Sequence, residues 1–140
     1  MRRTTPPLCL AAAILLGACG PSTDTPTAPA TSGAPTAGGE LSAGAAAEAI
    51  AALCDLRTTS DPDAANVAFF DRAHQTLHEL AAAAQTVDRA PAADLLETKQ
   101  VVEADLRSDT LPATFRRDVE DLLAAARTAL DTVGSTAPDC

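Results

Sequence analysis

The sequence of 140 residues has no tryptophan or tyrosine, only three phenylalanines and a single lysine. Without Trp and Tyr it offers few platforms on which a sugar or a nucleobase stacks. It also lacks a GxSxG motif and a glycine-rich loop before a helix, the signatures of serine hydrolases and of phosphate sites. No period-two alternation indicates a β-strand. These absences favour an all-α protein that is not an enzyme. A hydrolase is the last alternative, and it would need a concave pocket with a perturbed titratable group.

Acidic residues outnumber basic ones by 19 to 10, which gives a net charge of −9. Such a surface repels nucleic acid and anionic lipid head groups. We therefore expect no nucleic-acid partner. Basic partner proteins, cations or simple solubility all remain compatible with this charge.

The N-terminus begins with Arg2 and Arg3, followed by the apolar stretch 8–16. This stretch is shorter than the roughly 20 apolar residues that a membrane-spanning helix needs. A basic start, a short apolar core and small residues are typical of a secretory signal peptide. The run Leu16-Gly17-Ala18-Cys19 resembles the lipobox of bacterial lipoproteins, and the resemblance covers residues 1–19.

The lipobox resemblance implies cleavage before Cys19, a diacylglycerol on its sulfur and further acylation by a fatty acid such as palmitate. Two or more acyl chains hold a protein firmly at a membrane. We expect an extracytoplasmic protein in the cell envelope, with the membrane as a partner through its lipid. No aspartate follows Cys19, which favours the outer membrane in a cell that has two and otherwise the cell membrane. The alternative is an ordinary signal peptide with Cys19 incidental.

Composition divides the chain into three parts. Residues 1–18 form the expected signal peptide. Residues 19–41 begin with the lipidated cysteine and consist mostly of Pro, Thr, Ala, Gly and Ser, which bury no apolar surface. We expect a disordered linker there, with O-glycosylation of its threonines left open. Residues 42–140 carry helical patterning and form the expected domain.

The four cysteines have different expected fates. Cys9 leaves with the signal and Cys19 carries lipid, so Cys54 and Cys140 remain. In an oxidising compartment two such cysteines are best explained by one disulfide. In the chain-entropy model, closing a loop of this length stabilises the fold by about 4 kcal/mol. A redox or metal role is the alternative, but neither cysteine belongs to a CxxC motif.

Apolar residues recur at spacings of three and four through four segments. We expect helices over about residues 42–57, over 60–88, from 91 to about 106 and over about 110–133. Short turns between them predict an antiparallel up-down bundle. Its core would be rich in alanine. The second helix would direct one stripe toward the core, made of Val67, Phe70, His74, Leu77, Ala81 and Ala84.

The disulfide conflicts with the simplest version of this bundle. Cys54 would lie at one end, whereas the last helix would finish at the other. Either the tail 135–140 folds back along the bundle, or the first helix crosses it obliquely. Six extended residues, at about 3.3 Å each, reach far enough for the first solution.

His74 and His78 are the only histidines and lie four residues apart, with Asp71 three residues before His74. In a continuous helix at 100° per residue, these side chains would share one flank. A histidine pair at this spacing binds transition metals, with a carboxylate as third ligand. We therefore consider a metal site of Asp71, His74 and His78, for which Glu103 is an available fourth ligand. The simpler interpretation is a half-buried histidine pair and no resident cofactor.

Two further features have plain structural interpretations. Lys99 falls on the apolar stripe of the third helix, and we expect its amine to reach past this stripe to water. Asp118, Glu120 and Asp121 alternate with arginines and suggest a solvated face. We expect the domain to be a binding or protein-interaction module for an envelope partner. Metal binding is the alternative.

Overall fold

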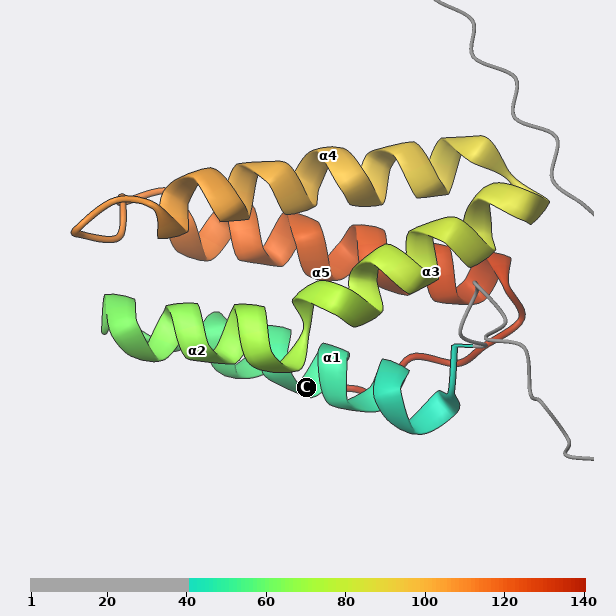
Figure 1. Ribbon diagram of the computed structural model, residues 1–140, viewed down its shortest axis with the longest axis horizontal. Helices are drawn as coiled ribbons and strands as arrows, with labels where there is room; N and C mark the ends of the chain where they lie inside the picture. Colours follow the sequence, from blue (N-terminus) through green and yellow to red (C-terminus); the bar gives the residue numbers. More distant parts are fainter. Residues whose placement is uncertain (1–40) are drawn as a thin grey trace, which may run out of the picture. The chain divides into compact units, whose positions relative to one another are not determined.

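The computed structural model describes residues 41–140. These residues form helices joined by short connections, followed by a C-terminal tail (Figure 1). The signal peptide, Cys19 and the linker up to residue 40 lie outside the described residues. Among the described helices, none combines the length and apolarity needed to cross a membrane. Five helices follow in order: α1 (Ala43–Leu56), α2 (Pro62–Arg72), α3 (His74–Val87), α4 (Arg89–Leu106) and α5 (Phe115–Thr132).

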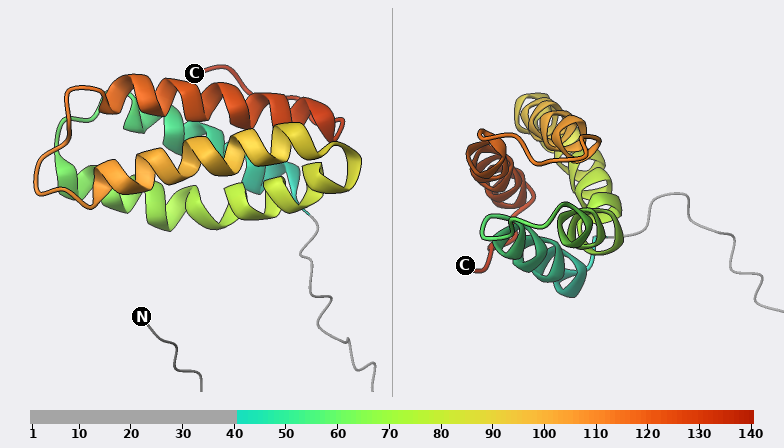
Figure 2. Two further views of the ribbon diagram at one scale, coloured as in Figure 1. Left: turned by 90° about the horizontal axis from the view of Figure 1, so that it is seen from above. Right: turned by 90° about the vertical axis from the view of Figure 1, so that its left-hand side faces the viewer.

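The helices form an antiparallel bundle of four arms, in which α2 and α3 together make the second arm (Figures 1 and 2). The chain reverses direction after α1, after α3 and after α4. Helix α4 packs against α3 and α5, while α1 packs against α2. Contacts of α5 with α1 and α3 close the bundle. The predicted small all-α bundle is confirmed.

Side-chain caps fix where three helices begin. The Ser42 hydroxyl accepts from the backbone N–H of Ala45 at 3.1 Å. Asp61 and Asp88 cap α2 and α4 in the same way, each with an acceptor distance of 2.9 Å. Each cap satisfies a backbone donor that has no partner within the helix. Because Asp88 is the cap, α4 begins at Arg89, and the expected start at Pro91 was wrong. Pro91 lies in the first turn, where a missing N–H costs little.

Helix α5 ends in a glycine-dependent cap. Gly134 has a φ of +74°, a left-handed conformation that glycine adopts without a steric penalty. The N–H of Ser135 donates to the Leu130 carbonyl at 2.9 Å, and that of Gly134 donates to the Asp131 carbonyl at 3.1 Å. These two bonds define a Schellman motif. The chain leaves it pointing back along the bundle.

The helix predicted over 60–88 is interrupted at Ala73, which has φ −119° and ψ −43°. The interruption separates α2 from α3 and corrects the expected single helix. On α2 the buried side chains are Ala65 and Phe69, followed by Ala73 itself and then Leu77 on α3. The predicted stripe was therefore wrong at its N-terminal end, where Val67 is 58% exposed and Phe70 44% exposed. Small Ala65 and Ala73 occupy the core positions instead.

The C-terminal tail returns along the bundle and ends in a disulfide between Cys54 and Cys140, with a Cα–Cα distance of 5.5 Å. The Arg127 guanidinium donates to the Pro138 carbonyl at 3.4 Å, which holds the tail beside α5 (Figure 2). The predicted disulfide is confirmed, and the fold-back of the tail is how its ends meet. The bond closes a loop with a sequence separation of 86, and in the chain-entropy model this stabilises the fold by about 4 kcal/mol.

Alanine and leucine dominate the interior. Buried alanines on every helix let the backbones approach closely, and larger side chains fill the space between them. The largest fully buried side chains are Phe69, Ile50, Leu53, Leu56, Leu77, Leu95, Leu122, Leu130, Val102 and Val119. Phe115 is also buried, so two of the three phenylalanines belong to the core. The expectation that Phe70 would join them was wrong.

Two adjacent phenylalanines provide a matched test of this packing. We expect Phe69→Ala to lower the free energy of unfolding by about 3–5 kcal/mol, because it leaves a cavity in the core. Phe70→Ala should lower it by less than about 1 kcal/mol, because that side chain is half exposed. Urea unfolding followed by circular dichroism measures both. Equal losses in the two variants would show that this face of α2 is placed wrongly.

Candidate functional site

A row of rings runs from α2 onto α3 on the outside of the bundle. The ring centres of Phe70 and His74 are 5.3 Å apart, and those of His74 and His78 are 4.8 Å apart. Phe69 supports the row from the core, with its ring centre 5.1 Å from that of Phe70. We call Phe70, His74 and His78 the α2–α3 row. It joins an exposed apolar ring to two imidazoles.

Helix α4 contributes a charged pair to the inner side of this row. Lys99 is only 3% exposed, and its ammonium donates to Glu103 Oε1 one turn later. His74 Nε2 lies 3.0 Å from the same oxygen. The guanidinium of Arg107 is 3.9 Å from Glu103 Oε2 and lies mainly in solvent. The prediction that Lys99 extends to water was wrong: its charge is neutralised inside the protein.

The charges in this cluster affect one another. Burial alone would raise the pKa of Glu103, but the hydrogen bond and charge of Lys99, aided by His74, outweigh it and lower that pKa. The pKa of His78 is lowered by partial desolvation, then by the positive charge of Lys99 and by the neighbouring His74. At neutral pH the His78 imidazole is therefore uncharged, and the Glu103 carboxylate is ionised.

His74, His78 and Glu103 each offer a ligand atom for a metal ion, and these atoms lie within 4.8 Å of one another. The two histidines were predicted from the sequence as metal ligands, with Glu103 as an available further ligand. Asp71 is not part of this group. It is exposed on α2, and the interruption at Ala73 breaks the continuous helical phase that would have aligned it with His74. Chemically, the cluster can ligate a cation or exchange a proton.

A second cluster joins α4 to α5. Asp118 is buried, and its Oδ1 is 3.3 Å from the Arg117 guanidinium. The neighbouring Asp105 has a buried oxygen, Oδ2, without a hydrogen-bond partner. Burial, followed by the charge of Asp118, raises the pKa of Asp105, and the protonated Asp105 carboxyl can donate a hydrogen bond to Asp118. The expected solvated face of α5 was therefore wrong at Asp118, although Glu120 and Asp121 are exposed.

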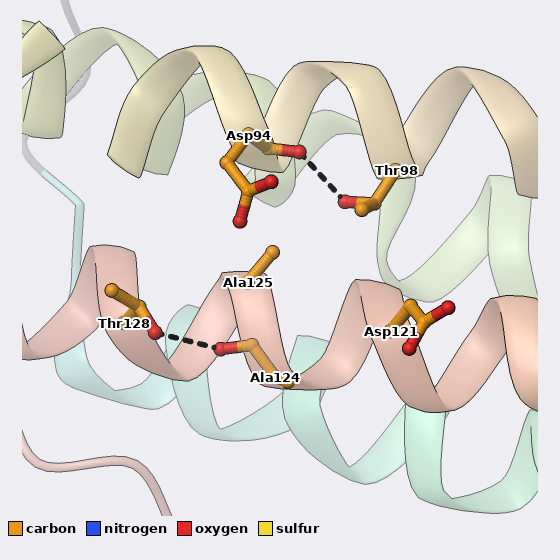
Figure 3. A pocket seen from close by; sticks show the side chains of 6 residues that line it. All are labelled: Asp94, Thr98, Asp121, Ala124, Ala125 and Thr128. Carbon is orange, nitrogen blue, oxygen red and sulfur yellow. Dashed lines mark hydrogen bonds between the residues drawn. The ribbon is translucent and has the colours of Figure 1, made fainter. Parts of the chain in front are cut away.

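A shallow groove of about 400 Å³ lies between α4 and α5 (Figure 3). Asp94 and Asp121 contribute carboxylates from opposite helices. The hydroxyls of Thr98 and Thr128 donate to carbonyls of their own helices, at 2.9 Å and 3.0 Å, so their protons are engaged. Alanines form the rest of the lining. The groove thus presents negative charge and few free donors.

No protein-family model matches this chain, and neither a curated protein nor a solved structure matches it.

Asp105 should make stability depend on pH in a defined direction. The pKa of the Asp105 carboxyl is higher in the folded protein than in the unfolded chain. The protonated carboxyl therefore stabilises the fold at low pH, and this stabilisation is lost as the pH rises through the pKa of the folded protein. Asp105→Asn keeps a donor toward Asp118 at every pH. We expect this variant to be more stable than the wild type at pH 7 by about 1 kcal/mol, with the difference disappearing below about pH 4.

Thermal unfolding between pH 3 and pH 8 measures this difference. Asp109→Asn is the matched control, because Asp109 is an exposed aspartate outside the pair. If Asp105→Asn destabilised the protein at pH 7, or if its effect did not vary with pH, the pKa of Asp105 would not be raised in the folded protein.

Proposed function

We propose that this chain is an extracytoplasmic lipoprotein, anchored by a lipid on Cys19, whose helical domain binds a partner protein at the cell envelope. The lipobox Leu16–Cys19 supports the anchor. The pairing of Cys54 with Cys140 also supports export, because structural disulfides persist in oxidising compartments. The two cysteines that would survive processing unlipidated are the two that pair.

The outer face of α2 is the observation that supports partner binding. Val67 is 58% exposed and Phe70 44% exposed, and one turn of helix separates them. Aromatic side chains such as Phe70 are enriched at protein interfaces, whose apolar centres are surrounded by polar rims. The neighbouring Asp63 and Asp71 are both exposed. The partner proposed for this face therefore has an apolar contact with basic residues around it.

Intact mass tests the anchor. Protein recovered from its native cells should lack residues 1–18 and carry the added mass of a diacylglyceryl group and further acyl chains on Cys19. A Cys19→Ser version should keep residues 1–18 and gain no lipid. Native protein that retains its first 18 residues, or that begins with an unmodified Cys19, would contradict the proposal.

Site-specific photocrosslinking tests the partner surface. A photoreactive phenylalanine analogue at position 70, expressed in native cells, should form one dominant adduct, because Phe70 lies in the proposed interface. The same analogue at Glu120, an exposed position on α5, is the matched control. Val67→Asp should abolish the adduct at position 70 without unfolding the domain. Equal adducts at both positions, or no effect of Val67→Asp, would contradict binding through this face.

A further inference from the structure

We propose that His74, His78 and Glu103 form a binding site for a divalent first-row transition-metal ion, such as zinc, nickel, copper(II) or cobalt. The site lies between α3 and α4. It needs no residue of the partner face on α2 and no lipid.

The geometry brings three good ligands to one place. Their ligand atoms lie within 4.8 Å of one another. Around a tetrahedral ion with bonds of about 2.0–2.2 Å, ligand atoms are about 3.4 Å apart. Small rotations of these side chains would close that gap, and His78 is free to make them because it is exposed at the surface.

The ligand types select the class of ion. Two imidazoles and one carboxylate suit zinc, nickel, copper(II) and cobalt. Calcium and magnesium prefer sets of oxygen ligands, which this cluster does not supply. The cysteines of the described residues, Cys54 and Cys140, are joined in a disulfide, so no thiolate here would favour copper(I). Three protein ligands leave a fourth position open to water or another ligand.

Lys99 sets the strength of the site. Its ammonium donates to Glu103 Oε1, the same oxygen that lies 3.0 Å from His74 Nε2. Exposure increases outward, from Lys99 at 3% to the Glu103 side chain at 14% and the His74 side chain at 30%. An ion would therefore arrive from the histidine side, with Lys99 behind the carboxylate. Because ion and ammonium compete for the charge of Glu103, Lys99 weakens binding, and its removal should strengthen it.

Isothermal titration of the full chain with Zn²⁺, Ni²⁺, Cu²⁺ and Co²⁺ tests the site. Every sample carries Cys9→Ser and Cys19→Ser, which remove the thiols that lie outside the disulfide. We expect at least one of these ions to bind with one-to-one stoichiometry and a Kd in the micromolar range. His78→Ala, at an exposed position that does not disturb the core, should weaken binding at least tenfold. Lys99→Met should strengthen it at least threefold.

Asp71→Asn is the matched control, because Asp71 precedes the histidines in sequence but lies outside the cluster, and it should change the Kd by less than twofold. Circular dichroism confirms that each variant is folded. The proposal is overturned if none of the four ions binds with a Kd below 1 mM, or if His78→Ala leaves the Kd unchanged. A Kd that responds to Asp71→Asn as strongly as to His78→Ala would also overturn it, as would one that Lys99→Met leaves unchanged or weakens.

Discussion

A single ammonium group lies in the apolar interior of this bundle, and its charge has to be balanced there. A buried charge without a partner destabilises the fold, because apolar side chains do not replace the interactions with water that the charge loses on burial. Glu103, one turn after Lys99, supplies the balancing carboxylate. The same carboxylate is within hydrogen-bonding distance of His74 on α3. Lys99 thus holds the Glu103 carboxylate between α4 and α3, where His74 and His78 lie beside it.

Local pattern predicted the helices best where apolar side chains are large and regularly spaced. On α4 the apolar stripe on which Lys99 was predicted to lie is buried, with Leu95 and Val102 beside the lysine. The pattern could not reveal that the lysine would be neutralised instead of reaching water. On α2 the stripe predicted through Val67 and Phe70 was wrong, because both side chains are exposed. The core takes Ala65 and Phe69 from this helix, and Phe70 remains half exposed. Contacts between helices, which the spacing of apolar residues does not contain, decide which side of α2 is buried.

The candidate site was predictable in part. The spacing of His74 and His78 identified the pair, but the carboxylate beside them comes from α4, not from Asp71 on the preceding helix. Glu103 takes the place expected for Asp71 because the helix is interrupted at Ala73. The sequence does not predict this interruption, since alanine favours helix. Asp105 and Asp118 lie on different helices, and only the packing of α4 on α5 brings them together. The disulfide was predictable by elimination among four cysteines, whereas the anchor at Cys19 remains a prediction.

The pairing of Lys99 with Glu103 is tested most directly by a double-mutant cycle on the free energy of unfolding. Glu103→Gln alone should destabilise the protein by about 3 kcal/mol, because it leaves the ammonium buried without an anion. Lys99→Met in the same chain should recover most of that loss, so that the two substitutions are strongly non-additive. Effects that add within about 0.5 kcal/mol would show that the two groups do not interact, and the account of this site would then be wrong.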